Sequence, residues 1–474
     1  MEGFYATPAI RLAARMRRNL TWLAAAAVPA LLSCAPAAAT APAPEGFAGM
    51  QAHRIEEPVL GGHMVVYEGG LGHDRSVLLV HGIGAGGARD WRETVGWLQR
   101  SYHVVAVDLP GFGASSKANA LYSPTNYARV LDRVTERFLR RPFVLVGHSM
   151  GAVASLRYAA TYPQDVAQLV VIDAPGILHR HSVSSQFLAQ LGMEFVPPWL
   201  DPREGLLNFA RKLLTPLARL RFEPQVILAS PQMRESLLGG DPTMIAGLAV
   251  VSEDLSADLA AVRAETLVVW GAKDLLVPPR TGKVLALKLP RAQLQVIADA
   301  AHTPMLEAPA EFRDVLLPFL ELGLPGAPAA RPAPLEKQGN ERCERERLRV
   351  YEGDYDVLTI LGCRQTTIRN ARVRELRIED SIVTIEDSRI GGGETGLVAR
   401  NSTVIATNVR IEAEVAIAAH ASRLDLAAVE LIGRQAAVSA TAQSYVVLSF
   451  SRVTSPRVRG DVHDFFTVGP QNPL

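Results

Sequence analysis

The sequence contains a serine set between two glycines, in the stretch G-H-S-M-G at residues 147–151. This stretch follows the β-branched run 143–146 and precedes an apolar helical stretch, 152–160. In a G-x-S-x-G turn between a strand and a helix, a strained backbone exposes the serine hydroxyl, and the glycines leave room for the tight turn. The start of the helix favours negative charge that develops there. The pattern therefore predicts that Ser149 is a catalytic nucleophile.

A serine hydroxyl needs a base within hydrogen-bond reach and a third group that orients the base. After a serine in this setting, the acid comes next in the chain and the histidine last. Asp274 follows the apolar run 266–270, and His302 follows the run 293–297. Because each follows a predicted strand, we expect Asp274 and His302 to meet Ser149. Asp254 and Asp258 are alternatives for the acid, but they precede the strand and are interpreted as helix-cap or surface residues.

Acyl transfer also needs donors for a developing oxyanion. The run 77–80 leads into a glycine-rich loop, 81–87, that is flexible enough to direct a backbone N–H inward. The main-chain amides of Ile83 and Met150 are the natural pair of donors for such an oxyanion hole.

The elements that must position these residues are short apolar runs that alternate with helical patterns. Continuous apolar strands of this kind predict an α/β fold with a parallel sheet that is covered on both faces. In such sheets the reactive groups lie just past the carboxyl ends of the strands. The runs are Met64–Tyr67, Val77–Val80, Val104–Val107, Phe143–Val146, Leu169–Ile172, Thr266–Trp270 and Gln293–Ile297.

With these motifs in place, residues 60–322 resemble the α/β-hydrolase family. The resemblance implies Ser149 as the nucleophile, Asp274 as the orienting acid and His302 as the base. No CxxC motif or His/Cys cluster indicates a zinc site, and neither a metal nor a cofactor is expected. The resemblance also implies structural roles for His81 and His148. A serine at the turn is unlike the aspartate of epoxide hydrolases and haloalkane dehalogenases. The matching stretches are His81-Gly82, Asp108–Gly113 with Ser115, Gly147–Gly151, Gly271–Asp274 and His302–Pro309.

The sequence departs from the family pattern at Ala301, where a glycine usually precedes the histidine. The segment of about 176–255 interrupts the strand pattern with apolar residues at helical spacing. It resembles the helical cap that covers the active site in many members of the family. The resemblance favours a small or medium, apolar ester as the substrate, although packing between cap helices explains the apolar residues equally well.

Composition excludes several other classes of protein. The chain has 474 residues, of which 48% are hydrophobic and 20% are charged, and its formal net charge is +1. A balanced charge is not typical of a nucleic-acid-binding protein, so no nucleic-acid partner is expected. Three cysteines are too few for a disulfide-rich fold, and their odd number indicates that one has a separate role.

The amino terminus has the pattern of an export signal. Arginines precede an apolar run that ends in Leu31-Leu32-Ser33-Cys34, which resembles the lipobox of bacterial lipoproteins. We expect a signal peptide over residues 1–33, with Met1 or Met16 as the start. A lipidated, Ala/Pro-rich tether then covers residues 34–49. Acylation of Cys34 would anchor the protein to the bacterial cell envelope, with the periplasm-facing outer membrane favoured. An ordinary cleaved signal with an incidental cysteine is the alternative.

A second domain is predicted over residues 341–474, after the first domain at 50–325 and a linker at 326–340. Four segments that begin at Ser381, Ser402, Ser422 and Ser444 align, at offsets of 21, 20 and 22 residues. A period near twenty without a helical stripe is typical of a solenoid. The pattern resembles a short right-handed parallel β-helix. Its acidic residues do not recur in one register, so we interpret the domain as a binding, spacing or packing module, with an envelope component as a further partner.

Cys343 and Cys363 are separated by about one turn of this repeat. Stacked strands lie about 4.8 Å apart, which is within the Cα separation that a disulfide tolerates. With Cys34 assigned to the lipid anchor, Cys343 and Cys363 are predicted to form a disulfide in an oxidising compartment.

These observations together predict a membrane-anchored serine hydrolase that cleaves a carboxylic ester through an acyl-enzyme. Amide, carbon–carbon or acyl-transfer chemistry on the same triad is one alternative. A non-catalytic envelope protein that works through its second domain is the other, and the intact triad argues against it.

Overall fold

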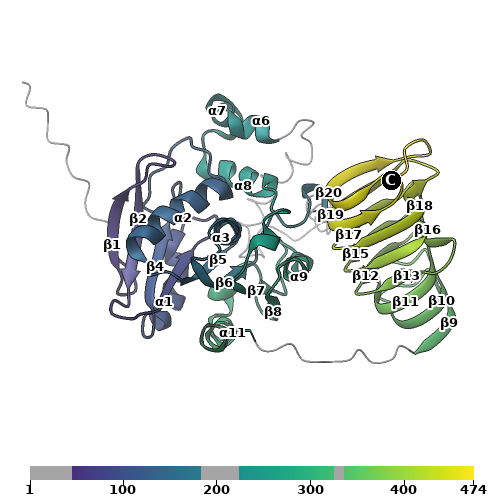
Figure 1. Cartoon of the computed structure of the whole chain (residues 1–474), viewed down its shortest axis with the longest axis horizontal. Helices are drawn as coiled ribbons and strands as arrows, with labels where there is room; N and C mark the ends of the chain where they lie inside the picture. The colour runs from purple at the N-terminus through teal and green to yellow at the C-terminus, as the bar shows by residue number, and fades with distance from the viewer. Residues whose placement is uncertain (1–44, 183–223, 325–335) are drawn as a thin grey trace, which may run out of the picture. The chain divides into compact units, whose positions relative to one another are not determined.

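An eight-stranded sheet forms the centre of the first domain (Figure 1). The computed structural model describes residues 45–182, 224–324 and 336–474. Along the sheet the order is β1-β2-β4-β3-β5-β6-β7-β8, with β1–β2 and β2–β4 antiparallel and the other pairs parallel. The strands are β1 (Gln51–Glu56), β2 (His63–Gly69), β3 (Ser76–Val80), β4 (His103–Asp108), β5 (Phe143–His148), β6 (Val166–Ile172), β7 (Glu265–Gly271) and β8 (Ala292–Ile297).

Both faces of this sheet are covered, because alternate residues of β3 enter two different cores. Leu78 and Val80 lie in one core, and Val77 and Leu79 lie in the other. The first core includes residues of α2 (Pro124–Phe138), α3 (Met150–Thr161) and α9 (Pro279–Lys288). The second core includes residues of α1 (Arg92–Leu98) and α11 (Pro309–Leu322). The short helices are η1 (Gly87–Trp91), η2 (Leu259–Ala261) and α10 (Pro304–Glu307).

Between β6 and β7 the structure places the last part of the predicted cap. It contains α6 (Pro224–Ala229), α7 (Pro231–Leu238) and α8 (Pro242–Ser252). Ser230 and Asp241 cap the amino ends of α7 and α8, and each helix begins with a proline, which fits the first helical position. The apolar residues of the cap between 183 and 223 lie outside the described residues.

The second domain is mostly parallel β structure with its own apolar core. Three sets of strands pair in parallel: β12, β15, β17 and β19; β13, β16, β18 and β19; and β14, β16 and β18. The strands are β9 (Lys337–Glu344), β10 (Val350–Leu361), β11 (Thr366–Glu379), β12 (Ile382–Glu386), β13 (Arg389–Gly391), β14 (Thr395–Arg400), β15 (Thr403–Thr407), β16 (Arg410–His420), β17 (Arg423–Ala427), β18 (Glu430–Ala440), β19 (Ser444–Thr454) and β20 (Arg459–Val468).

The repeated serines of this domain have a structural explanation. The amide of Ser381 donates to the Ser402 hydroxyl (3.1 Å), that of Ser402 to the Ser422 hydroxyl (3.2 Å) and that of Ser422 to the Ser444 hydroxyl (3.2 Å). Each of these serines is buried, so its hydroxyl satisfies a backbone N–H that water cannot reach. The predicted alignment agrees with the strand register, which pairs equivalent apolar residues: Val383 with Val404, Val404 with Leu424, and Leu424 with Val446.

Two details of the second domain differ from the sequence-based expectation. Strand β9 begins at Lys337, within the stretch 326–340 that was expected to be a linker. It is polar and exposed apart from Cys343, so its apolar pattern was too weak to identify. The last strand, β20, pairs with β19 in the antiparallel direction.

In the described part of the chain, no helix is long and apolar enough to cross a membrane.

Candidate active site

Ser149 lies between the end of β5 and the first residue of α3, with φ 51° and ψ −120°. This conformation is uncommon for a residue that has a side chain, and it points to a strained turn. The Ser149 amide donates to the carbonyl of Ile172 (2.8 Å), which ties the turn to the end of β6. The neighbouring sheet strand therefore fixes the position of the serine.

The two glycines of the turn are required by close backbone packing. A Cβ atom at Gly147 would lie 2.5 Å from the carbonyl oxygen of Gly151 and 2.7 Å from the Cα of Ala152. A Cβ atom at Gly151 would lie 2.4 Å from the carbonyl oxygens of Val80 and His81. A side chain at Gly147 would push the turn away from the start of α3, and one at Gly151 would push it away from the end of β3.

The three residues predicted to form the triad come together in the structure. The Ser149 hydroxyl is 3.0 Å from Nε2 of His302, and Nδ1 of His302 is 2.8 Å from Oδ2 of Asp274. All three side chains are buried. This network assigns Nδ1–H of His302 as the donor to Asp274, which leaves Nε2 free to accept the serine proton.

Two loops bring Asp274 and His302 to the same place. Asp274 follows β7, and its Oδ1 accepts the amides of Leu276 (2.8 Å) and Val277 (2.9 Å). The amide of Lys273 donates to the carbonyl of Ala300 (2.9 Å), so the loop after β7 is joined to the loop after β8. The carboxylate is thus held by its own loop while it orients the histidine.

Asp173 is an acid of this site that the sequence analysis did not identify. It follows β6 with φ 47°, and its Oδ1 accepts the amide of Gly271 (3.0 Å). Burial raises the pKa of the Asp173 carboxyl well above its usual value, and the neighbouring Asp274 charge raises it further. The rule that led to Asp274, an acid at the carboxyl end of a parallel strand, also applies to Asp173.

Asp173, Asp274 and His302 each offer one ligand atom, and these atoms lie within 4.8 Å of one another. A cation could be held by such a set. In this arrangement, however, Nδ1 of His302 is hydrogen-bonded to Asp274, and Oδ1 of Asp173 accepts the amide of Gly271. The geometry describes two buried acids side by side, one of which orients the histidine.

The two expected oxyanion donors belong to segments that adjoin Ser149. A Cβ atom at Gly82 would lie 2.8 Å from the Cβ of Ser149, so the loop that carries Ile83 runs directly against the serine. Met150 follows Ser149 in the chain. Neither the Ile83 amide nor the Met150 amide donates a hydrogen bond to another described residue. Both N–H groups are therefore available to an oxygen atom bound at this position.

His81 and His148 are the alternatives for the catalytic base. Both form hydrogen bonds with backbone groups instead. His81 is buried, which lowers its pKa; its Nδ1 is 2.5 Å from the carbonyl of Gly82, and its Nε2 accepts the amide of Leu109 (3.0 Å). Nε2 of His148 donates to the carbonyl of His302 (2.6 Å), and burial lowers the pKa of His148 to about 3. Both rings are neutral at pH 7 and position the loops on either side of Ser149.

The alternative acids are engaged elsewhere. The Asp258 carboxylate pairs with Arg157 (2.5 Å), and that of Asp254 accepts the amide of Ser256 (2.8 Å). Ala301 needs no glycine, because its φ is not positive. A further acid supports this loop: the Glu307 carboxylate contacts the amide of Ala301 and accepts the Thr303 hydroxyl (2.8 Å).

The two cysteines that the structure describes belong to the second domain. Cys34 lies outside the described residues. Cys343 of β9 and Cys363, which follows β10, are joined by a disulfide and are buried in the core of the second domain.

Comparison with known proteins places the first domain in a family. Residues 75–309 match the alpha/beta hydrolase fold family. Lipase 1 of Psychrobacter immobilis is 29% identical over 257 residues, which cover 54% of this chain and 79% of that protein. A monoacylglycerol lipase of Homo sapiens is 24% identical over 269 residues, which cover 54% of this chain and 77% of that protein.

Among solved structures, an esterase of Exiguobacterium antarcticum is 20% identical, with a TM-score of 0.44 over 57% of this chain and 100% of that one. The matched residues 75–309 contain the strained serine turn, the histidine and the acid whose contacts are given above. The first domain of this chain is an α/β-hydrolase, and the protein is an enzyme of the hydrolase class.

Proposed function

We propose that this protein hydrolyses carboxylic esters through an acyl-enzyme on Ser149. The observation that carries the proposal is the continuous hydrogen-bonded chain from the Ser149 hydroxyl through His302 to Asp274, at 3.0 and 2.8 Å. A serine hydroxyl in this arrangement can lose its proton as it attacks, because the base is in contact and correctly oriented.

In the proposed reaction, Oγ of Ser149 attacks the ester carbonyl carbon while Nε2 of His302 takes the hydroxyl proton. The amides of Ile83 and Met150 bind the oxyanion. When the C–O bond breaks, His302 gives the proton to the leaving alcohol, and an acyl-serine remains. Water then attacks the acyl group, His302 takes its proton and returns it to Ser149, and the carboxylic acid leaves. Asp274 stabilises the imidazolium formed in both halves of the reaction.

The proposed substrate is a small or medium ester with an apolar acyl group. The relatives named above are lipases, one of them a monoacylglycerol lipase, and this supports acyl esters as the class. The described end of the cap adds support, because α8 is apolar and buries Ile245, Leu248 and Val250 in the core that contains Met150.

The experiment that tests this function compares Ser149→Ala with the wild-type protein on p-nitrophenyl esters of increasing chain length. We expect Ser149→Ala to lower kcat by about 10⁴-fold or more, since the nucleophile is lost. Thr161→Ala, at the exposed end of the same helix, is the matched control and should keep wild-type turnover. Turnover by Ser149→Ala at the wild-type rate would refute the proposal.

We also propose that lipidated Cys34 anchors the enzyme to the bacterial cell envelope, at the periplasm-facing outer membrane. Support comes from the lipobox-like sequence and from the Ala/Pro-rich tether that follows it. Cys34→Ala should release the protein from the membrane fraction and abolish its labelling by radioactive palmitate. A variant that stays in the membrane fraction would contradict the anchor.

For the second domain we propose a right-handed parallel β-helix. Its support is the three sets of parallel strands, in which residues 20 to 22 positions apart pair with one another. An envelope component as a ligand of this domain stays a prediction.

A further inference from the structure

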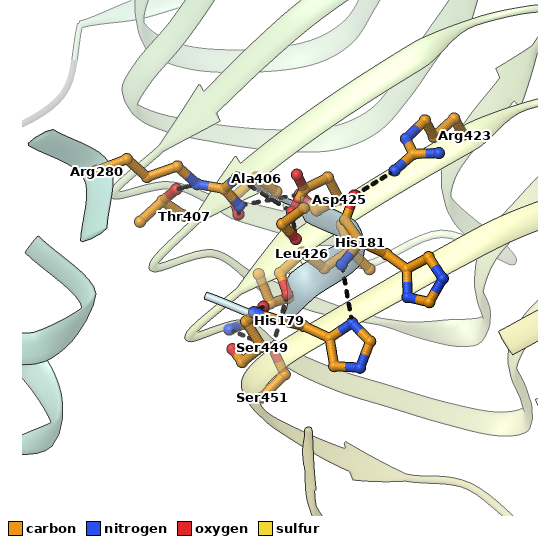
Figure 2. Close-up of polar contacts among 12 residues, drawn as sticks. His179, His181, Arg280, Ala406, Thr407, Arg423, Asp425, Leu426, Ser449 and Ser451 are labelled. Carbon is orange, nitrogen blue, oxygen red and sulfur yellow. Dashed lines mark hydrogen bonds and ion pairs between the residues drawn. The ribbon is translucent and has the colours of Figure 1, made fainter. Parts of the chain in front are cut away.

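Helix α9, which follows the Asp274 loop, contacts the second domain through its second residue (Figure 2). Nε of Arg280 donates to the Thr407 hydroxyl (2.6 Å), and Nη2 donates to the carbonyls of Ala406 (2.8 Å) and Asp425 (3.1 Å). Nη1 of Arg280 forms an ion pair with Oδ1 of Asp425 at 3.1 Å. All three nitrogen atoms of one guanidinium group from the first domain are therefore bound by residues of β15 and β17.

This contact is buried on both sides. The side chain of Arg280 is 10% exposed and that of Asp425 is 3% exposed, and Thr407 is completely buried. A buried arginine that lost its carboxylate would leave an uncompensated charge, so the two side chains are held strongly to one geometry. One turn further along α9, Nζ of Lys283 lies 2.5 Å from the Asp387 carboxylate and 3.4 Å from that of Glu386, and these groups are more exposed.

The segment that follows Asp173 is held by β17 and β19 of the second domain. Oδ1 of Asp425 accepts the Ser182 hydroxyl (2.8 Å), and the Ser449 hydroxyl accepts the amide of His179 (2.9 Å). Arg423 donates to the carbonyl of His181 (2.8 Å). Apolar contact accompanies these bonds, because a single core contains Ile177 and Leu178 of the first domain with Ala427 and Phe450 of the second.

Both contacted segments lead directly to the paired acids of the active site. The amides of Leu276 and Val277 bind Asp274, and the chain reaches Arg280 three residues after Val277. The carbonyl of Val277 accepts Nε1 of the buried Trp270 (2.9 Å), which makes this stretch continuous with β7. A displacement of Arg280 would therefore be transmitted through a few packed residues to the carboxylate of Asp274, which orients His302.

We propose that the second domain positions the catalytic acid, with Arg280 and Asp425 as the positioning residues that fix the loop of Asp274. This inference rests on the proposed function, because it assigns the second domain a part in ester hydrolysis. The second domain is then a structural requirement for full turnover, in addition to any ligand that it binds.

The test uses the full chain with Arg280→Gln and Asp425→Asn. Ester turnover is divided by the concentration of active sites that react with a fluorophosphonate. Misfolded protein is therefore not counted as enzyme. We expect kcat per reactive site to fall about 10- to 100-fold, the range that small displacements of catalytic groups produce, with KM within twofold of the wild-type value. The kcat of Arg280→Lys should lie between that of these two variants and that of the wild type. Lysine keeps the positive charge but cannot form the several parallel hydrogen bonds of a guanidinium group.

A second measurement does not depend on activity. Hydrogen exchange of the peptide 272–278 should become faster in Arg280→Gln and Asp425→Asn. The loop that contains Asp274, the acceptor of the Leu276 and Val277 amides, is then held less firmly and opens more often. Arg369→Gln breaks the exposed ion pair with Glu352 in the second domain and is the control, with wild-type turnover and exchange. If Asp425→Asn does not fold, Thr407→Val removes one acceptor of Arg280 and keeps the ion pair.

The outcomes separate this proposal from the proposed function. Wild-type protein that does not hydrolyse esters would refute the proposed function, while the exchange of peptide 272–278 would still test the positioning role. Active wild-type protein together with unchanged kcat per site and unchanged exchange in both variants would overturn the positioning role, even if both variants melted at a lower temperature.

Discussion

At the scale of single residues, the environment separates two acids that lie side by side. Burial and the Asp274 charge raise the pKa of Asp173 well above its usual value. Asp274 accepts three N–H groups, from Leu276, Val277 and His302. A protonated carboxyl can donate to its neighbour, and we interpret Asp173 as a neutral support for the orienting carboxylate.

Substitution of each acid by its amide tests this assignment. Asp274→Asn should lower kcat about 10⁴-fold, because the amide stabilises the wrong tautomer of His302. Asp173→Asn has the shape and hydrogen-bonding capacity of the protonated acid, so its kcat should stay within about threefold of the wild type. Ester turnover per reactive site measures both. A loss in Asp173→Asn as large as that in Asp274→Asn would contradict the assignment.

The buried His148 predicts how the stability of the protein depends on pH. Burial lowers its pKa from 6.5 to about 3 in the folded protein. Below pH 6.5 the unfolded chain binds a proton that the folded chain accepts only near pH 3, so this group lowers stability as the pH falls. Its contribution to the free energy of unfolding should decrease by about 1.4 kcal/mol per pH unit over this range.

His148→Gln keeps a donor for the His302 carbonyl and cannot titrate. Urea unfolding of both proteins at pH 7.5, 6.0 and 5.0 measures the difference. As the pH falls, the unfolding free energy of the wild type should decrease relative to that of His148→Gln. A gap that does not change with pH would show that His148 is not buried as a neutral ring.

At the scale of elements, the serine turn depends on how closely α3 approaches β3. Gly151→Ala places a methyl group 2.4 Å from two carbonyl oxygens. We expect a loss of stability of about 1–3 kcal/mol and lower kcat, since the turn that carries Ser149 must move. Gly96→Ala in α1 is the matched control, because its added Cβ meets no atom within 4 Å. That variant should be unchanged or slightly more stable. Equal stability of both variants would contradict the packing argument.

The sequence predicted most elements of the first domain, because a parallel sheet that is buried on both faces leaves continuous apolar runs. All seven predicted strands are present. The edge strand β1, Gln51–Glu56, was missed because it is mostly polar and only one residue, Ile55, is fully buried within it. In the site, Ser149, Asp274 and His302 followed from their places after strands. Asp173 also directly follows a strand and was overlooked. The contacts of Glu307 depend on close packing between loops, which leaves no local pattern.

At the scale of the whole molecule, the repeat in the second domain was visible because paired residues recur about every twenty positions. The contact between the domains could not be predicted from the sequence. Arg280 and Asp425 are 145 residues apart and belong to no periodic pattern, so only the fold brings them together.

The disulfide between Cys343 and Cys363 should stabilise the end of the second domain where β9 pairs with β10. It closes a loop of 20 residues, which by loop-closure entropy is worth about 3 kcal/mol. The double variant Cys343→Ala and Cys363→Ala should melt at a lower temperature than the oxidised wild type. Thiol titration of the denatured, non-reduced protein is the direct check. Two reactive thiols at these positions would contradict the bridge.

The central claim of this account is that Ser149 carries the acyl group during turnover. The most direct test mixes the enzyme with a p-nitrophenyl ester, stops the reaction with acid within milliseconds and locates the added acyl mass by peptide mass spectrometry. We predict a single acyl group on the peptide that contains Ser149, at up to one group per active site. Ester turnover with no acylated peptide, or with the acyl group on another residue, would contradict the account.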